Sequence, residues 1–332
     1  MDTNLVNDIR RGLEEKRATV CERCRRDEAG MVDDRDVQPH LHVIDESLQK
    51  LEAGTLGVCT VCQGIVDERL LQMDYTACVC LDHYSSQERR QLENELELSQ
   101  VVQRALLPQQ VPELPGFDIA GFSRPAQIIG GDYFDFLAFN DGAHGLVVAD
   151  VSGKGVSAGI LMTSLQTAFH TIVPETDSPL KVLEKINRLY IHNIKFTTFV
   201  TIFFAKIDPR TRTLVYANAG HAPALLYHAR NKEHEWLRRT GLAIGLMEEF
   251  SVHSESLQLE RGDTLVFYTD GVTEAMSPRQ ELFERERLAE VIAHNEGAPA
   301  DALIQKILQA LNEFAQGDPL ADDATLVVCK VQ

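Results

Sequence analysis

Gly130-Gly-Asp-Tyr-Phe-Asp-Phe136 and, after a short polar gap, Val147-Val-Ala-Asp-Val-Ser-Gly-Lys-Gly-Val-Ser-Ala-Gly159 form the stretch that decides the fold. Asp132 and Asp150 each lie at the end of an apolar run that is typical of a buried strand. A carboxylate buried alone is too costly, so it must be paired or bound to a metal ion. The sequence therefore predicts further acidic residues that meet these two.

Matching acidic residues occur far downstream, again beside β-branched apolar runs. They are Asp270 in Phe267-Tyr-Thr-Asp-Gly-Val-Thr-Glu-Ala275, and Asp322 and Asp323 in Asp322-Asp-Ala-Thr-Leu-Val-Val328. Oxygen ligands without histidine suit hard divalent cations such as Mg²⁺ or Mn²⁺. We therefore expect a metal-assisted hydrolase.

These segments, in this order, resemble the PPM-type metal-dependent protein serine/threonine phosphatases. The likeness is strongest to the bacterial branch that regulates sigma-factor partner switching, which includes the stage II sporulation protein E type. It runs from about Leu106 to the C-terminus, and several linked motifs are more specific than any single Asp-Gly pair. It also includes three shorter motifs: Ala105-Leu-Leu-Pro108, Arg124-Pro-Ala126 and Asn218-Ala-Gly-His-Ala-Pro223.

The resemblance implies two stacked, mostly antiparallel sheets flanked by helices, and a site with two Mn²⁺ or Mg²⁺ ions. Asp150 would bridge the ions with help from the Val151 carbonyl, Asp132 would serve the first ion, and Asp270 and Asp322 the second. Asp323 would bind through water or orient Asp322. Two such ions activate a water molecule as the attacking group. In this family the usual substrate is a phosphorylated anti-sigma-factor antagonist, which makes a phosphorylated protein the expected partner.

Four other features near these motifs have competing interpretations. Arg124 is placed to bind the substrate phosphate, although a surface ion pair is commoner for a lone arginine. His221 lies in a turn-like segment, where a hydrogen-bonded structural histidine is commoner than a proton donor to the leaving oxygen. Asp135 is more typical of a structural acid than of a metal ligand. Gly153-Lys154-Gly155 lacks the spacing of a Walker loop, which disfavours nucleotide hydrolysis.

The N-terminal region contains six of the seven cysteines. Cys59 and Cys62 form a knuckle, and Cys80 and His83 follow with a matching spacing, as in a tetrahedral zinc site with three thiolates and one imidazole. Cys78 is an alternative to His83 as the fourth ligand. Cys21 and Cys24, with His40 and His42, would make a second metal or redox site, but inert helix residues are the more ordinary interpretation. These last four, with Cys78, complete the set of candidates in this region.

Residues from about Asp2 to Tyr84 resemble the DksA/TraR-type zinc finger, with a helical hairpin ahead of the cysteine knuckle. We expect one helix from Asp2 to about Ala29, a second helix containing Leu41 and Leu51, and an acidic tip at Asp33-Asp-Arg-Asp36 between them. An alternative function follows from this likeness. The module would then act on RNA polymerase as a transcription regulator, with the C-terminal region as a scaffold or sensor.

An amphipathic linker helix is predicted from Ser85 to about Leu107. Its apolar stripe, Leu92, Leu96, Val102 and Leu106, must pack either against the same helix of a second chain, giving a homodimer, or against its own domain. The predicted domains are thus 1–84, regulatory; 85–112, linker helix; and 113–332, phosphatase.

The 332 residues carry a formal net charge of −18, which disfavours general binding to nucleic acid. No apolar run has the length of a membrane span, and the charged N-terminus lacks the apolar core of a secretory signal. We therefore expect a cytoplasmic protein.

The remaining secondary structure favours an α+β layered sandwich over an alternating parallel sheet, because strands occur in adjacent runs interrupted by paired helices. A turn at Asp208-Pro-Arg-Thr211 joins two of the strands. Strands are predicted from Phe117 and over 133–139, 145–151, 199–207, 214–219, 251–257, 264–269 and 324–331, and helices over 157–172, 179–192, 287–294 and 299–314.

Overall fold

The computed structural model describes residues 9–11, 13, 14, 17, 34–66, 79–153, 155–193 and 199–332. The chain forms two compact units. The first contains the residues up to Leu98 together with 192–198, and the second consists of Ser99–Ile191 and Phe199–Gln332. The predicted boundaries at 84 and 112 remain a prediction.

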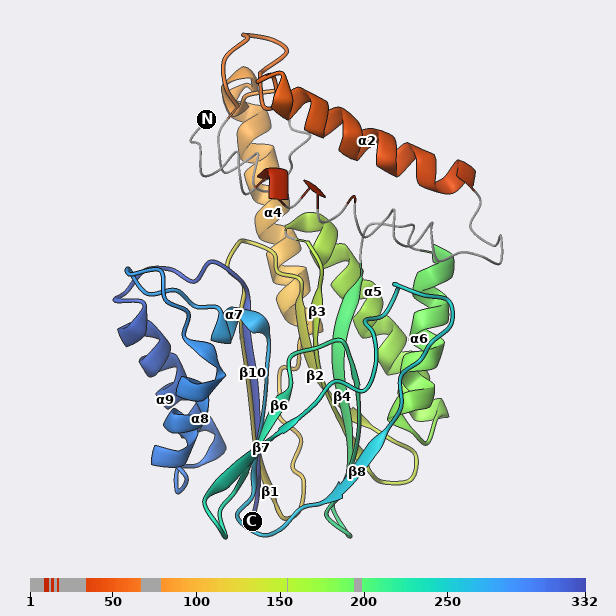
Figure 1. Ribbon diagram of the computed structural model, residues 1–332, viewed down its shortest axis with the longest axis vertical. Helices are drawn as coiled ribbons and strands as arrows, with labels where there is room; N and C mark the ends of the chain where they lie inside the picture. The colour runs from red at the N-terminus through yellow and green to blue at the C-terminus, as the bar shows by residue number, and fades with distance from the viewer. Residues whose placement is uncertain are drawn as a thin grey trace. The chain divides into compact units, whose positions relative to one another are not determined.

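The second unit is built on two five-stranded sheets in which all neighbouring strands are antiparallel (Figure 1). One sheet has the order β1-β10-β9-β6-β7 and the other the order β2-β3-β4-β5-β8. The strands are β1 Phe117–Arg124, β2 Asp132–Ala138, β3 His144–Val151, β4 Val200–Asp208, β5 Thr213–Ala219, β6 Ala224–His228, β7 Glu233–Leu237, β8 Glu255–Gln258, β9 Thr264–Tyr268 and β10 Ala324–Val331.

The main hydrophobic core lies between the two sheets. Side chains alternate along each strand, so Val327 and Cys329 on β10 join a core that also contains Phe203 of the other sheet. Val328, between them, faces the opposite way and packs with Ile304 of a covering helix. Both faces of this sheet are therefore buried along β10, which explains the apolar run Leu326–Cys329 in that strand.

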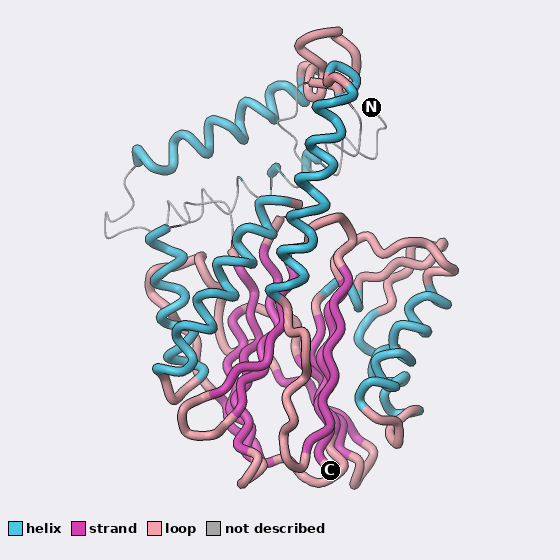
Figure 2. Tube along the Cα trace, turned by 180° about the vertical axis from the view of Figure 1, so that it is seen from behind, coloured by secondary structure: helices cyan, strands magenta, loops and turns pink. Residues whose placement is uncertain are grey.

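Helices cover the outer faces of both sheets, giving four layers (Figures 1 and 2). On the side of β2 and β3, the ring of Phe169 packs 5.8 Å from Tyr133 and 5.1 Å from Phe204 between ring centroids. The layered α+β prediction is confirmed. The helices are α5 Val156–Ile172 with η2 Val173–Glu175 and α6 Pro179–Asn193 on one side, and α7 Asp270–Thr273, α8 Glu284–His294 and α9 Ala300–Phe314 on the other.

All eight predicted strands are present, and the hairpin at Asp208 joins β4 to β5. The strand predicted over 251–257 is shorter and begins only at Glu255. β6, β7 and the short helix α7 were not predicted. β7 is a charged edge strand, Glu233-His-Glu-Trp-Leu237, which lacks the β-branched signal used to find the others.

By length and apolar composition alone, one stretch of the described residues, Val156–Glu175, could cross a membrane. Met162, Leu165 and Phe169 of this stretch have no exposed surface. They pack inside the second unit as the side chains of a core helix do.

In the first unit, α2 spans Asp34–Glu52. Asp34–Asp36, which were expected in the acidic tip between two helices, form the first turn of this helix, and Asp33 lies outside the described residues, so the tip itself stays a prediction. Residues 9–11, 13, 14 and 17 are helical as predicted. Leu13 and Ile44 are buried, and Arg17 Nε lies 2.6 Å from Asp45 Oδ1.

The helix predicted from Ser85 to about Leu107 is present as α4, Ser86–Leu106, and its role as a linker between domains stays a prediction. It begins with a capping box: Glu88 N donates to Ser85 Oγ over 3.2 Å, and Ser85 N donates to Glu88 Oε2 over 2.8 Å. Several apolar side chains of the helix are exposed, with Leu98 at 64% and Val101 at 62%.

Candidate functional site

Asp132 and Asp150 are directly opposite each other on neighbouring strands. Asp132 opens β2 and Asp150 is the penultimate residue of β3, and the two are paired in register. Phe134 and Val148, two residues away on each strand, belong to the core between the sheets, so period-two alternation directs both carboxylates toward the same end of that gap. Like charges placed opposite each other are destabilising unless a cation lies near them.

The opposite sheet contacts the Asp132–Asp150 pair through Thr269, the residue that follows β9. Thr269 Oγ1 donates to Asp132 Oδ2 over 2.7 Å and accepts from Thr325 N over 2.9 Å. Thr269 has no exposed surface. Because Asp270 is the next residue, this contact brings the third acidic segment to the first two.

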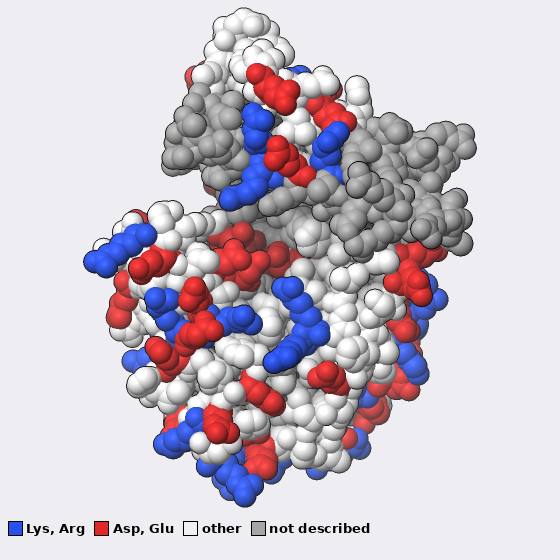
Figure 3. Space-filling view, viewed as in Figure 1, with Lys and Arg blue, Asp and Glu red and all other residues white. Residues whose placement is uncertain are grey.

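The fourth acidic segment packs closely on the third. A β-carbon at Gly271 would collide with the carbonyl oxygen of Asp323, and it would lie 3.2 Å from the carbonyl carbon of Asp322. Asp323 also accepts hydrogen bonds at both carboxylate oxygens, from Ala126 N to Oδ1 and from Gly131 N to Oδ2, each over 2.7 Å. All the acidic segments found in the sequence thus meet at one end of the sandwich. Figure 3 shows acidic side chains gathered at the level just above α7.

Burial and like charge together disfavour ionisation at this site. Burial raises the pKa of Asp132 well above its usual value, and the charges of Asp150 and Asp323 raise it further, against hydrogen bonds from Thr325 and Thr269. Burial also raises the pKa of Asp323, although backbone N–H groups of Ala126 and Gly131 oppose the shift. A bound cation would relieve both penalties. The donor set, carboxylate oxygens and nearby main-chain carbonyls, fits Mg²⁺ or Mn²⁺.

A cavity of about 260 Å³ adjoins the acidic cluster. Asp132, Asp323 and Arg124 line one part of it, and Gln103 and Arg104 of α4 line another. The Arg124 side chain is exposed at the end of β1, and the part of the chain that the structure describes shows no ion pair to it. The position of Arg124 beside Asp132 suits an anion-binding residue.

The contacts of His221 and Asp135 are those of structural residues. His221 is buried, with Nδ1 2.7 Å from Thr201 Oγ1 and Nε2 3.1 Å from the Tyr268 carbonyl. Burial lowers its pKa to about 4, so the imidazole is neutral. Asp135 accepts from Tyr133 Oη and lies 2.8 Å from His170 Nε2, on the face of β2 opposite to Asp132. The structural interpretation of both residues is the one that their contacts favour.

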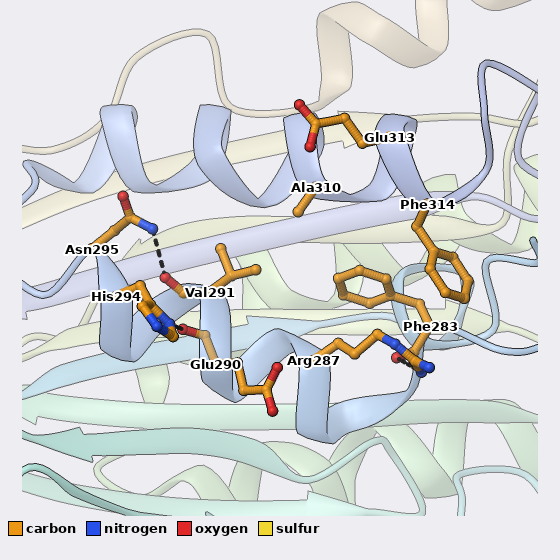
Figure 4. Close-up of a pocket in the computed structure, with 9 residues that line it drawn as sticks. All are labelled: Phe283, Arg287, Glu290, Val291, His294, Asn295, Ala310, Glu313 and Phe314. Atoms are coloured by element: carbon orange, nitrogen blue, oxygen red, sulfur yellow. Dashed lines mark hydrogen bonds between the residues drawn. The ribbon is translucent and has the colours of Figure 1, made fainter.

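A larger hollow of about 500 Å³ lies between α8 and α9, away from the acidic cluster (Figure 4). Arg287 stacks on Phe314, with its guanidinium 4.8 Å from the ring centroid, and donates to the carbonyl oxygens of Leu282 and Phe283. The phenyl rings of Phe283 and Phe314 are 5.4 Å apart. These contacts are those of helix packing, and the hollow contributes no residue to the acidic site.

In the first unit, Cys59, Cys62, Cys80 and His83 converge, with one ligand atom from each within 4.8 Å of the others. The Sγ atoms of Cys62 and Cys80 are 3.8 Å apart, which matches the separation of about 3.8 Å for two thiolates at 2.3 Å from a tetrahedral zinc ion. It is far too long for a disulfide. His83, in the short helix η1 Leu81–His83, therefore stands where a fourth ligand belongs.

The knuckle geometry stabilises the thiolate of Cys59, whereas burial and the neighbouring Cys59 and Cys62 raise the pKa of Cys80 to about 12. Cys59 N donates to Gly64 O over 2.7 Å, and Val61 N and Cys80 N each lie 3.4 Å from Cys59 Sγ. Burial raises the pKa of Cys59, but hydrogen bonds from the backbone of Cys62, Cys80 and Val61 outweigh it and lower the pKa to about 6. Cys21, Cys24, Cys78 and the side chain of His40 lie outside the described residues.

Sequence reasoning missed the residues that hold the acidic segments in place. Thr269 supports Asp132 from 137 residues away, and Gln103 of α4 bonds the backbone of Gly130. Neither residue has a local pattern that marks it, because its partner is distant along the chain. The Thr-Asp-Gly order at 269–271 is the one signal that could have pointed to Thr269.

Comparison with known proteins supports these observations. The family model described as Stage II sporulation protein E (SpoIIE) matches residues 140–332, which include Asp150, Asp270 and Asp322. The phosphoserine phosphatase RsbU of Bacillus subtilis (strain 168) is 31% identical over 243 residues, covering 73% of this chain and 71% of RsbU. The phosphoserine phosphatase RsbP of the same strain is 26% identical over 242 residues, covering 72% of this chain and 58% of RsbP.

Solved structures show the same architecture. The RsbU and RsbW domains of Rv1364c from Mycobacterium tuberculosis are 30% identical with a TM-score of 0.60, over 68% of this chain and 63% of that one. The SiaA-PP2C domain of Pseudomonas aeruginosa has a TM-score of 0.65 at 20% identity, over 75% of this chain and 100% of that one, which is a likeness of fold.

Proposed function

Because this chain belongs to the stage II sporulation protein E family and is a serine/threonine phosphatase, we propose that it hydrolyses phosphoserine or phosphothreonine on a regulatory partner protein with two bound Mn²⁺ or Mg²⁺ ions. The relatives RsbU and RsbP are phosphoserine phosphatases by name. By the family likeness, the substrate is a phosphorylated anti-sigma-factor antagonist and the protein works in the cytoplasm.

The observation that carries the proposal is the pairing of the buried Asp132 with the partly exposed Asp150 at one end of the sandwich, with Asp323 adding negative charge. Desolvated carboxylates in such a group are tolerated when they hold cations. RsbX, a protein with a likeness of fold to this chain, was solved in complex with magnesium. The oxygen-only donor set here is the kind that magnesium and manganese prefer.

Each acidic residue has its own role in this site. By their match to the family motif, Asp150 would hold both ions with help from the Val151 carbonyl, Asp132 would hold the first ion, and Asp270 and Asp322 would hold the second. When bound, such ions lower the pKa of a water molecule and neutralise charge on the phosphoryl oxygens.

The remaining residues of the site orient the reacting groups. Arg124, exposed beside Asp132 in the cavity, binds the substrate phosphate with its planar guanidinium. Asp323 is committed to two backbone N–H groups, so it orients the loop before Asp132 and supports Asp322, whose Oδ1 accepts from Asp323 N over 2.9 Å. Any direct contact of Asp323 with an ion would use its remaining lone pairs.

Release of phosphate from a phosphoserine peptide and from para-nitrophenyl phosphate tests the activity. Wild-type protein should be active with Mn²⁺ and inactive with EDTA, and Asp150→Asn should lose activity by at least about a hundredfold. Asp141→Asn is the matched control, since Asp141 is an acidic residue of the same β2–β3 hairpin that pairs with Lys206 at the far end. If wild type and Asp150→Asn are equally inactive with several metals, the proposal fails.

We also propose that Cys59, Cys62, Cys80 and His83 bind one Zn²⁺ and that the N-terminal module regulates the phosphatase. The four convergent ligand atoms support the zinc site. The exposed Leu92, Leu98, Val101 and Val102 of α4 support a homodimer through the linker helix. Light scattering of the full chain, compared with a Val101→Lys variant, tests the dimer, which a monomeric wild-type protein would contradict.

A further inference from the structure

Gln103 differs from every other side chain of α4, a helix that the structure describes from end to end. It is the only buried residue among those described in this helix, with 8% of its surface exposed, whereas Val101 and Val102 beside it are 62% and 52% exposed. Glutamine is normally found at the surface, and a buried amide must have its donor and acceptor satisfied. A polar residue buried among exposed apolar ones therefore indicates a specific contact.

Both ends of the Gln103 amide bond the same backbone residue. Nε2 donates to the Gly130 carbonyl over 2.7 Å, and Gly130 N donates to Oε1 over 3.1 Å. The pairing fixes the orientation of the amide, since exchanging its O and N would place like groups together. Nearby, Gln100 Nε2 donates to the Ile128 carbonyl over 2.9 Å. The C-terminal part of α4 is thus hydrogen-bonded to the loop that leads to Asp132.

The same loop is held from its other side by Asp323. Gly131 N donates to Asp323 Oδ2 over 2.7 Å, and a β-carbon on Gly130 would lie 2.6 Å from this oxygen. The Gly131 carbonyl in turn accepts from Val151 N over 3.4 Å. The two glycines directly before Asp132 are therefore enclosed by α4, by the last acidic segment and by the end of β3, with no room for a side chain.

We propose that Gln103 is a positioning residue that sets the backbone of Gly130-Gly131, and with it the Asp132 carboxylate, in the geometry that binds the metal ions. The inference rests on the proposed phosphatase function. Gln103 does not touch the reacting atoms. Gln103 acts through the backbone, because its side-chain amide is hydrogen-bonded to Gly130, and Asp132 is only two residues further along the chain.

The test measures the Mn²⁺ concentration that gives half-maximal hydrolysis of para-nitrophenyl phosphate, the kcat at saturating Mn²⁺, and the urea unfolding midpoint in EDTA. Gln103→Leu removes both hydrogen bonds. It should raise the half-activating Mn²⁺ concentration by about tenfold to a hundredfold, as loss of a residue that orients a metal ligand does, while kcat at saturating Mn²⁺ changes by less than about threefold. Gln91→Leu is the control on the same helix, since Gln91 is exposed and bonds Glu95. Its Mn²⁺ requirement should be that of wild type.

Gln103→Glu covers the case in which Gln103→Leu does not fold. It keeps the length and the acceptor for Gly130 N but sets a carboxylate oxygen against the Gly130 carbonyl, so the Mn²⁺ requirement should again rise. A folded variant whose Mn²⁺ requirement stays within about twofold of wild type overturns the inference, even if its unfolding midpoint falls. An inactive wild-type protein that binds no Mn²⁺ would instead overturn the proposed function, and this inference with it.

Discussion

Replacing Thr269 by valine should destabilise the second unit more than any other single hydroxyl deletion on β9 or at its end. The Thr269 hydroxyl donates to Asp132 and accepts from Thr325 N, and the side chain is fully buried. An ordinary hydrogen bond contributes about 0.5 to 1.5 kcal/mol, and an orphaned buried N–H costs about 1 to 3 kcal/mol. Allowing for relaxation, Thr269→Val should lower the free energy of unfolding by about 2 to 4 kcal/mol.

Thr264 at the start of the same strand provides a matched control. Its hydroxyl is buried and has no hydrogen-bond partner among the described residues. Thr264→Val should therefore change the free energy of unfolding by less than about 0.5 kcal/mol, or stabilise the protein slightly. Both substitutions replace a hydroxyl with a methyl group, so strand propensity and size cancel in the comparison.

Urea unfolding in EDTA, followed by the fluorescence of the single tryptophan, measures both variants. That tryptophan, Trp236 on β7, packs with its ring centroid 6.4 Å from the ring of Tyr268, next to Thr269. EDTA separates the stability of the metal-free fold from metal binding. Equal losses in the two variants, or no loss in Thr269→Val, would refute the claim that this hydroxyl ties the two sheets together at the acidic site.

Three further outcomes are expected. Burial lowers the pKa of His221 in the folded state to about 4, so the unfolded state binds more protons between pH 6.5 and 4, and the free energy of unfolding should fall by about 3 kcal/mol as the pH drops through that window. His221→Gln should remove this pH dependence in urea unfolding measured at several pH values, and an unchanged pH dependence would disprove the assignment. The purified full-length chain should contain one zinc ion per molecule by atomic absorption. Cys59→Ser should lose the zinc and leave the unfolding of the second unit unchanged, whereas Cys329→Ser should keep it, because Cys329 is buried in the sandwich core. A zinc-free wild-type protein would contradict the site. Arg124→Ala should raise the KM for a phosphoserine peptide about tenfold or more with a smaller effect on stability, whereas an unchanged KM in steady-state kinetics would leave Arg124 as a surface residue.

The sequence predicted those parts of the fold whose signal is local. β10 was predicted with its observed bounds because an eight-residue stretch rich in apolar and β-branched residues is typical of a strand. The start of α4 has a local signal too, because Ser85 and Glu88 make a capping box. β6 was missed because Ala224-Leu-Leu-Tyr-His228 is too short and too rich in leucine to distinguish a strand from a helix. The start of α2 at Asp34 was missed because acidic residues suit a helix N-terminus as well as a loop.

The acidic site was also predictable in part, because its main residues have a local signal. Asp132, Asp150, Asp270 and Asp322 all adjoin apolar runs, and a buried carboxylate requires partners, so the sequence alone is enough to expect that they meet. Thr269 and Gln103 could not be found in this way. Their roles depend on which face of a strand or helix meets a segment that is distant along the chain, and one sequence does not contain that information.

Calorimetric titration of the metal-free protein with Mn²⁺ tests the central claim most directly. Binding at two sites per chain is expected. Asp150→Asn should reduce the affinity at both sites, because the proposal has Asp150 hold both ions, and Asp141→Asn should reduce it at neither, because Asp141 pairs with Lys206. Equal Mn²⁺ binding by wild type and Asp150→Asn, or no binding by folded wild-type protein, would contradict the two-metal site.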